Sequence, residues 1–417
     1  MRYLIGFLTM ATILAGGFAF LFKSNTSEIS VNDLPAIPEA RVLSVATSSF
    51  AIVKKSDEDI ENQKSLVNLP SEIKAVYMTS WSSGSEKKTD YLIKLIKETE
   101  LNAVVIDIKD FSGYITYDIK NSDVEKYGAK QIRTLKINSL IKKFHDENIY
   151  VIARITIFQD PILAKAHPEW AIHSKTKCQS SNINCQMLSS TLWLDHKGLA
   201  WMDPAAKEVW DYNVAIGKDA LNRGFDELNF DYIRFASDGF IGDMGFPVWN
   251  EIIPKQEVIK NFFKYLREQF SDAKISADLF GQATIDKNDL GIGQIIEDAY
   301  AYFDYICPMV YPSHYAKMFL GYKNPANYPY EVVKYSMDSA LQKIGNWKLE
   351  IGNSLAINKS PKLRPWLQDF DLGADYDAEK VKKQIQGVYD SASSTPESIN
   401  GWMLWSPSNV YTREALE

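Results

Sequence analysis

Between residues 74 and 406 the chain alternates eight short strand-like segments with segments of helical periodicity. This alternation limits the possible folds more than any other feature. The strand-like segments are short apolar runs, whereas the helical segments repeat apolar residues three and four positions apart. Strand–helix repetition is typical of a parallel sheet whose connections are helices. Eight repeats over this length predict a (β/α)8 TIM barrel.

We expect the strands at 74–79, 102–110, 150–156, 224–235, 274–279, 305–311, 364–370 and 401–406. Segment 348–351 competes for the seventh position. The expected helices are 89–100, 135–147, 205–223, 256–270, 295–302, 331–344 and 378–389. An open doubly wound sheet is the alternative fold, and it is disfavoured because no Gly-rich phosphate-binding turn follows the first strand.

The N-terminal segment predicts export. Residues 3–22 carry no charge and lie between Arg2 and Lys23. An apolar run of this length can span a bilayer as a helix. The segment after this run makes a poor cleavage site, which favours an uncleaved signal-anchor at 1–23 over a removed signal peptide. Residues 24–70 show no sustained periodicity and predict a flexible linker, followed by the barrel at 71–417. The domain is then extracytoplasmic, either anchored to the membrane or secreted.

The cysteines agree with export. Cys178 and Cys185 flank a short polar loop and are expected to form a disulfide, with a pair of free thiols as the alternative. No histidine accompanies them at metal-ligand spacing, so no metal site is expected. Cys307 lies in an apolar run and is expected to be a buried thiol.

Charge excludes one class of partner. The net charge is −7 and no block of Lys or Arg occurs, so a nucleic-acid partner is not expected. The chain also lacks a Gly-x-Ser-x-Gly nucleophile elbow, and no cofactor is expected.

The segment 224–235 predicts a buried strand that carries polar groups. Asn229 and Asp231 point to one face, while Leu228, Phe230 and Tyr232 point to the other. A buried carboxylate is costly unless another group pairs with it or uses it. One interpretation is a structural ion pair between Asp231 and Arg234. The other is a catalytic carboxylate at the mouth of the barrel.

Polar and aromatic side chains follow most of the expected strands, where a barrel carries its active site. Two carboxylates are the minimum for glycoside hydrolysis, one as acid and one as nucleophile or base. Asp231 and Asp278 come from adjacent strands and are the expected pair, with Asp369 as a third catalytic candidate. The acid must stay protonated near neutral pH, although an isolated Asp titrates at about 3.9. The candidate substrate-binding residues are Asp107, Lys109, Arg154, Asn229, Arg234, Tyr311, His314, Trp366, Gln368, Trp402 and Trp405. Asp107 and Lys109 are expected to share a face of their strand.

Several segments carry a family resemblance. These segments are Lys74-Ala-Val-Tyr, Asn102-Ala-Val-Val-Ile-Asp-Ile-Lys, Phe225-Asp-Glu-Leu-Asn-Phe-Asp-Tyr-Ile-Arg-Phe, Met309-Val-Tyr-Pro-Ser-His-Tyr, Arg364-Pro-Trp-Leu-Gln-Asp-Phe and Gly401-Trp-Met-Leu-Trp-Ser-Pro. From about residue 72 onward the chain resembles the bacterial "putative glycosyl hydrolase domain" family, related to the α-amylase clan. The resemblance implies a (β/α)8 barrel that acts on polysaccharide.

The amylase-like pattern also implies residue roles. Asp231 matches its nucleophile on the fourth strand, and Asp369 matches its stabilising Asp after the seventh. Asp278 stands where the pattern has a Glu acid, and Asn229 where it has Arg. Besides an exported glycoside hydrolase, two other functions fit the sequence: a non-catalytic glycan-binding barrel of the cell envelope, and a structural envelope protein.

Overall fold

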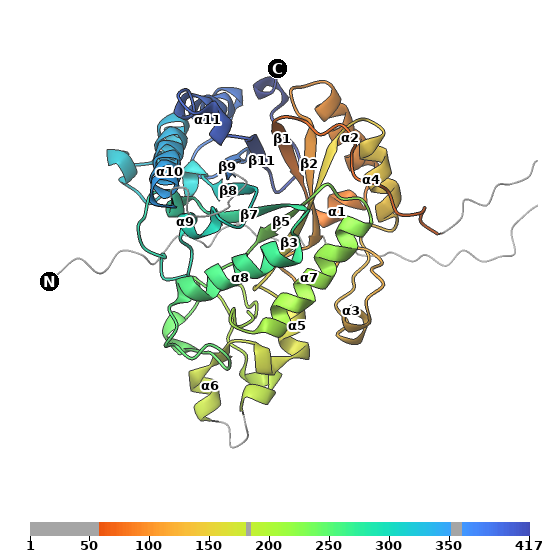
Figure 1. The fold of residues 1–417 in the computed structure, drawn as a ribbon, viewed down its shortest axis with the longest axis vertical. Helices are drawn as coiled ribbons and strands as arrows, with labels where there is room; N and C mark the ends of the chain where they lie inside the picture. The colour runs from red at the N-terminus through yellow and green to blue at the C-terminus, as the bar shows by residue number, and fades with distance from the viewer. Residues whose placement is uncertain (1–57, 181–184, 352–360) are drawn as a thin grey trace, which may run out of the picture. The chain divides into compact units, whose positions relative to one another are not determined.

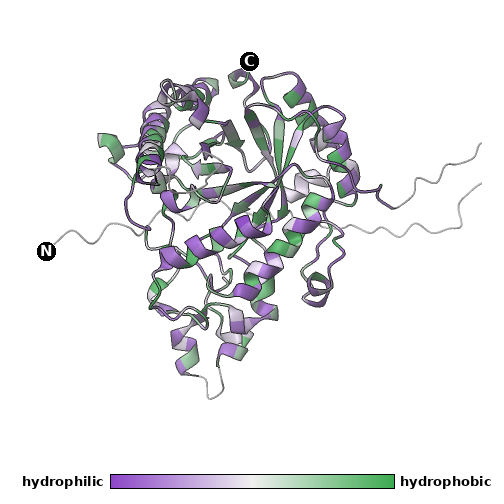
Figure 2. Cartoon of the chain, in the orientation of Figure 1, coloured by the Kyte–Doolittle hydropathy of each residue, from purple (hydrophilic) through white to green (hydrophobic). Residues whose placement is uncertain are grey.

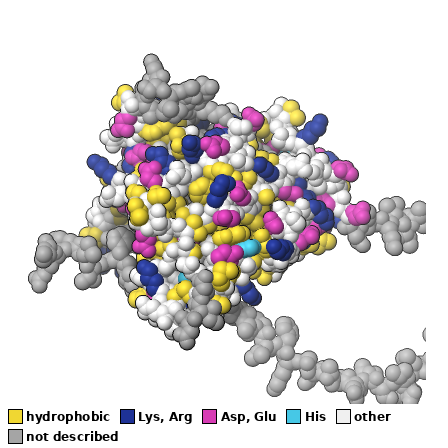
Figure 3. Space-filling model, turned by 60° about the horizontal axis from the view of Figure 1, so that its bottom comes forward, with side chains coloured by type: hydrophobic (Ala, Val, Ile, Leu, Met, Phe, Trp, Pro, Cys, Tyr) yellow, Lys and Arg dark blue, Asp and Glu magenta, His cyan; other side chains and the backbone are white. Residues whose placement is uncertain are grey.

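The computed structural model describes residues 58–180, 185–351 and 361–417 (Figure 1). The predicted signal-anchor and most of the predicted linker lie outside these ranges. Within them, no helix is both long and apolar enough to cross a membrane. The face drawn in Figure 3 intersperses basic, acidic and apolar side chains, and no basic patch dominates it.

Eight parallel strands close into a barrel, as predicted. They are β1 (Ile73–Met78), β2 (Ala103–Lys109), β3 (Tyr150–Thr156), β5 (Glu227–Asp231), β7 (Lys274–Phe280), β8 (Tyr305–Met309), the interrupted pair β9 (Lys362–Leu363) and β10 (Trp366–Gln368), and β11 (Gly401–Trp405). Neighbours pair in chain order. The ring closes because β1 pairs with β11, while β10 pairs with both β11 and β8.

The seventh barrel position is split. β9 pairs with β8, and β10 pairs with β11, with Arg364 and Pro365 between them. Proline has no N–H to donate to a ladder, so an interruption is expected at Pro365. The competing segment 348–351 is wrong for this strand, because it ends a helix, α10 (Pro329–Ile351).

Helices surround the barrel (Figure 1). The connecting helices are α2 (Glu86–Lys97), α4 (Ile137–His145), α7 (Lys207–Asn222), α8 (Lys255–Gln269), α9 (Ile296–Ala299), α10 and α11 (Ala378–Ser391). Short helices add to the loops: α1 (Ser80–Ser83), α3 (Ser122–Lys126), α5 (Pro161–Ala166) and α6 (Lys175–Gln179). Among the helices, the main departures from expectation are the longer α10 and the shorter α9. The fourth strand, expected at 224–235, is the shorter β5.

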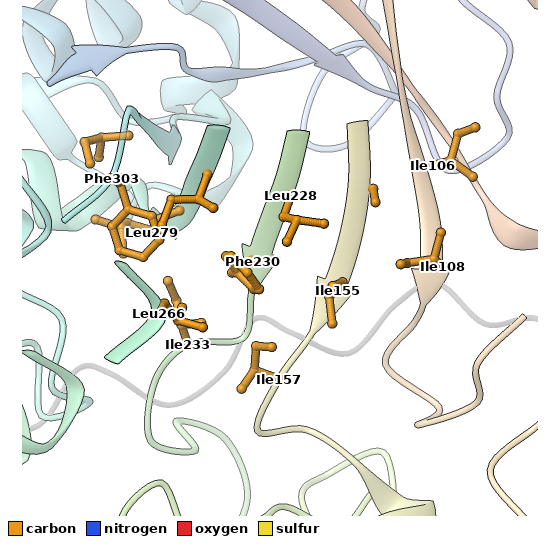
Figure 4. Close-up of a cluster of buried hydrophobic side chains, with 14 of the residues drawn as sticks. Ile106, Ile108, Ile155, Ile157, Leu228, Phe230, Ile233, Leu266, Leu279 and Phe303 are labelled. Carbon is orange, nitrogen blue, oxygen red and sulfur yellow. The ribbon is translucent and has the colours of Figure 1, made fainter. Parts of the chain in front are cut away.

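Strand alternation divides the core into two regions. Leu228, Phe230 and Ile155 lie on the outer face of the barrel strands, in the cluster of Figure 4. Ala75 and Ile152 instead belong to the cluster that fills the lumen. Because successive side chains of a strand point to opposite faces, each strand contributes to both regions. The predicted facing of Leu228 and Phe230 is confirmed, and Figure 2 shows the apolar strands at the centre.

The long segment after β3 folds back on the loop after β5. A two-stranded antiparallel sheet joins β4 (His173–Ser174) to β6 (Met244–Gly245). Below the barrel in Figure 1, α5 and α6 form part of this extension. The predicted disulfide between Cys178 and Cys185 is present, with their Cα atoms 5.2 Å apart, and Cys307 is a buried free thiol.

Residues 58–70 lie against the barrel domain. The carboxylate of Asp59 accepts hydrogen bonds from the backbone N–H groups of Asn138 (2.7 Å) and Ser139 (3.0 Å). These are the second and third residues of α4, whose own N-cap residue, Lys136, provides no side-chain cap. Asp59 therefore caps α4 from a distant part of the chain.

We expect Asp59→Ala to lower the free energy of unfolding by about 1 kcal/mol, because two N–H groups of α4 lose their acceptor. Urea unfolding of the full-length chain measures the change. Glu61→Ala is the control, since Glu61 is exposed and its side chain makes no hydrogen bond or ion pair with the described residues. Equal stability of the two variants would contradict the capping role.

Candidate active site

One guanidinium holds three carboxylates at the mouth of the barrel. Arg154, at the end of β3, is 5% exposed. Its Nη1 donates to Asp107 Oδ1 at 2.6 Å, and its Nη2 donates to Asp231 Oδ2. Its Nε lies 3.5 Å from Asp278 Oδ2. The carboxylates come from β2, β5 and β7, so the predicted pair Asp231 and Asp278 meets on one cation.

Strand register explains this convergence. Arg154 pairs with Asp107 on one side and with Asn229 on the other. Asp231 and Asp278 each follow the paired residues Phe230 and Ala277, so they lie side by side. Asp231 therefore pairs across the sheet with Arg154, and the alternative ion pair with Arg234 is not formed. Asn229 stands where the amylase-like pattern has an arginine. In this structure the guanidinium beside Asp231 comes from Arg154, on the neighbouring strand β3.

Asp278 is the most perturbed carboxyl of this cluster. Its Oδ1 accepts hydrogen bonds from Asn229 Nδ2 and Trp366 Nε1, both at 2.8 Å. Burial raises the pKa of Asp278, and the nearby charge of Asp231 raises it further, to about 7. Arg154 and the two hydrogen bonds oppose this shift but do not cancel it. Near neutral pH, Asp278 therefore retains a proton in part of the molecules.

The same contacts shift the pKa values of Arg154 and Asp107. Burial opposes the charge of Arg154, yet Asp107 and Asp231 raise its pKa well above the ordinary value. Burial also raises the pKa of Asp107, while Arg154 and the hydroxyl of Tyr77, which donates to Asp107 Oδ2 at 2.5 Å, counteract that change.

Aromatic rings line one side of the guanidinium. Tyr77 and Trp405 stack with centroids 3.8 Å apart and planes 11° from parallel. The Arg154 Cζ lies 5.0 Å from the ring centroid of Trp405. Trp405 is partly exposed and presents an apolar surface next to the carboxylates. Such surfaces suit the apolar faces of sugar rings.

Sequence reasoning missed part of the lumen network. Below the cluster, Ser276 Oγ donates to Glu227 Oε1 at 2.6 Å, and Arg364 Nη2 donates to the same oxygen. Asn229 Nδ2 connects the two levels by donating to Ser276 Oγ at 3.1 Å. Alternate residues of a strand share one face, so Glu227 is expected on the same face as Asn229. This pattern could have predicted Glu227 as a member of the network. Tyr77 lies within the first expected strand, at 74–79.

Three predicted residues lie outside this cluster. Lys109 forms a buried ion pair with Asp160 (2.8 Å), because an irregularity between Asp107 and Lys109 ends their shared facing. Asp369 accepts two hydrogen bonds from Thr412, at 2.9 and 2.7 Å. Trp402 belongs to the outer core, since two-residue alternation opposes it to Trp405.

The remaining candidates lie on the loops above. Gln368 accepts from the Ser313 N–H and donates to Phe370 O, so it ties two loops together. Tyr311 lies 5.2 Å from the ring of His314 and 5.8 Å from that of Phe370, measured between centroids. Arg234 packs between Trp201 and Phe280. Within the described ranges, no group of three or more His, Cys, Asp or Glu residues is arranged to hold a metal ion.

Comparison with known proteins supports the reading of the fold. The family model described as "Putative glycosyl hydrolase domain" matches residues 75–411. Among curated proteins, none matches the chain. The glycoside hydrolase domain of PgaB (BpsB) from Bordetella bronchiseptica is similar in fold, at 14% identity and a TM-score of 0.54, over 84% of this chain and 99% of that one.

A second solved structure is closer in sequence. It is a hypothetical protein from Ruminiclostridium thermocellum ATCC 27405, and the two sequences are 36% identical. The match covers 49% of this chain and 96% of the hypothetical protein, with a TM-score of 0.42.

We expect Asp278→Asn to stabilise the protein in alkaline but not in acidic solution. In the folded protein the pKa of Asp278 is about 7, against an ordinary value of 3.8. Between these values the folded state holds a proton that the unfolded chain has released, so wild-type stability falls as the pH rises. Asparagine carries no charge at any pH and avoids that loss.

By urea unfolding, the variant should exceed the wild type by about 2–4 kcal/mol near pH 8 and by less than about 1 kcal/mol near pH 4.5. Asp90→Asn is the control, because Asp90 is exposed and pairs only with Lys143 on the surface. A gain for Asp278→Asn that does not change with pH would contradict the shifted pKa.

Proposed function

The chain belongs to the "Putative glycosyl hydrolase domain" family, and we propose that it hydrolyses glycosidic bonds of a polysaccharide or oligosaccharide. One observation carries this proposal: two adjacent carboxyl groups are held in different electrostatic states. The pKa of Asp278 is raised to about 7. Asp231 instead accepts a hydrogen bond from the positively charged Arg154 through its Nη2. Hydrolysis of a glycoside needs one protonated and one ionised carboxyl group.

In the proposed mechanism, Asp278 is the general acid. Its Oδ1 accepts from two neutral donors, Asn229 and Trp366, which leaves Oδ2 to carry the proton. The proton passes to the oxygen of the leaving sugar as the glycosidic bond breaks. The resulting carboxylate keeps both hydrogen bonds and gains attraction from the Nε of Arg154, 3.5 Å away.

Asp231 acts on the anomeric carbon, either directly or through a water molecule. Its Oδ1 accepts the backbone N–H of Tyr232 at 2.5 Å, and its Oδ2 accepts from Arg154. Both bonds fix the orientation of the carboxylate. The stacked rings of Tyr77 and Trp405 would carry the sugar beside it.

A second candidate function follows from burial. The side chain of Asp278 is only 1% exposed, and Arg154 contacts all three carboxylates. An enclosed cluster with internal ion pairs would also suit a non-catalytic glycan-binding barrel. Binding of the full-length chain to a polysaccharide array without release of reducing ends would select this function over hydrolysis.

We also propose that the protein acts outside the cytoplasm, with residues 1–23 as a signal-anchor, 24–70 as a linker and 71–417 as the catalytic domain. The support is the apolar run 3–22 and the Cys178–Cys185 disulfide, since disulfides persist in oxidising compartments. Protease accessibility on intact cells tests the location. The mass of the mature chain distinguishes an anchored from a cleaved N-terminus.

We expect Asp231→Asn and Asp278→Asn each to lower hydrolysis of a cell-envelope or storage glycan by about 10²–10⁴-fold, because each removes one partner of the carboxyl pair. Wild-type kcat/KM should fall above about pH 7, where Asp278 loses its proton. Release of reducing ends across a pH series measures both effects.

Asp369→Asn separates this arrangement from the amylase-like pattern. Since Asp369 bonds to Thr412 and not to Arg154, we expect its variant to keep activity within about tenfold of the wild type. Wild-type rates in the Asp231 and Asp278 variants would remove the proposed function.

A further inference from the structure

Arg234 is a second buried guanidinium at the mouth of the barrel, and it differs from Arg154 in having no carboxylate partner. It is 7% exposed. Its Nη1 donates to two neutral acceptors, Phe235 O and Ser237 Oγ, both at 3.0 Å. Among the described residues, no Asp or Glu lies within ion-pair distance of Arg234. A buried cation without a counter-ion is costly, so a structure retains one where something else supplies the charge.

The remaining N–H groups of Arg234 are available to a ligand. Its Nε and Nη2 make no hydrogen bond within the described part of the chain, yet neither is among the fully enclosed polar atoms that lack a partner. Both atoms therefore keep some contact with the molecular surface. Nε and Nη2 form one edge of the guanidinium plane, which presents two parallel N–H groups. That edge matches two oxygens of a carboxylate or a phosphate.

Its packing places the guanidinium at the ends of the strands that carry the carboxyl pair. The Cζ of Arg234 lies 5.5 Å from the ring centroid of Tyr232 and 4.6 Å from that of Phe280. Tyr232 follows Asp231 directly, and Phe280 is two residues beyond Asp278. Trp201, 4.7 Å away, packs against the same group. The aromatic rings fix the guanidinium over the ends of β5 and β7.

Neighbouring acidic groups do not neutralise it. Asp231, Asp238 and Asp195 act on Arg234 only from beyond ion-pair distance, and the carboxylate of Asp231 already accepts from Arg154 Nη2. The carboxylate of Asp195 accepts from Trp201 Nε1 and from backbone N–H groups of its own loop. Burial lowers the pKa of Arg234, whereas the carboxylates around Arg154 raise the pKa of that residue. Of these two guanidinium groups at the barrel mouth, Arg154 contacts carboxylates directly, whereas Arg234 has none within ion-pair distance among the described residues.

We propose that Arg234 binds an anionic substituent, a carboxylate or a phosphate ester, on the sugar next to the scissile bond. The inference rests on the proposed hydrolase function for the position of that sugar, while the anion site itself needs no hydrolysis. The substrate class is then an acidic glycan. The planar edge of Arg234 forms two parallel hydrogen bonds to the anion, and the enclosed position strengthens them.

The test compares D-glucuronate, D-glucose 6-phosphate and D-glucose as probes of the full-length protein, by ligand-observed NMR titration. We expect one of the two anions to bind at least about tenfold more tightly than glucose, and the tighter one identifies the substituent. Arg234→Gln should bind all three probes equally. Arg234→Lys should keep a reduced preference, because lysine retains the charge without the planar pair of donors.

Arg267→Gln is the matched control. Arg267 lies on α8 and donates to Tyr302 O and Asp304, so its loss affects stability and leaves the preference for the anion intact. Melting temperatures of all variants verify folding. Asp231→Asn should lose hydrolysis and still prefer the anion, which separates the two proposals. Equal binding of the three probes by the wild type, or an unchanged preference in Arg234→Gln, would overturn the anion site.

Discussion

The mouth of this barrel depends on the charge of Arg154. Three carboxylates cannot be enclosed together without a cation, because each loses its hydration and repels the others. One guanidinium contacts all three, but its single positive charge cannot balance three negative charges. Burial and the nearby charge of Asp231 raise the pKa of Asp278. Asp278 also has the weakest contact with the guanidinium, since its Oδ2 lies 3.5 Å from Arg154 Nε. The difference between the two proposed catalytic groups thus follows from burial together with the sharing of one cation.

The lumen beneath supports this arrangement. Arg364, Glu227, Ser276 and Asn229 form a chain of hydrogen bonds that ends on Asp278. Glu227, Ser276 and Asn229 come from strands, and Arg364 joins β9 to β10. These strands are held on their other face by the apolar layer beneath the helices. Polar groups fixed in this way keep their geometry without solvent. The site is therefore positioned by the rigid part of the fold, while the loops contribute its rim.

Periodicity in the sequence was sufficient to predict the barrel and much of the site. Asp231, Asp278, Arg154, Asn229 and Trp366 were all expected near strand ends, and the structure brings them together. The partner of Asp231 could not be predicted, because pairing across strands depends on register, which a single sequence does not reveal.

The same limit explains the misplaced residues. The irregularity in β2 that turns Lys109 away has no mark in the residues around it. Asp369 was expected beside the pair, but Thr412, more than forty positions later in the chain, takes both of its oxygens. Trp402 could have been placed by counting alternate positions from Trp405. Local pattern thus gives the facing of a residue in a regular strand, and it fails where a bulge or a distant segment intervenes.

The divided seventh strand has a mechanical consequence. Two short ladders, β9 and β10, replace one continuous strand there, so the cylinder has its fewest backbone bonds along this seam. Trp366, whose indole holds Asp278, begins the second ladder. Local separation costs least where backbone bonds are few. Local opening of the wall at this seam would therefore release the indole of Trp366 from Asp278 and loosen the buried acid first.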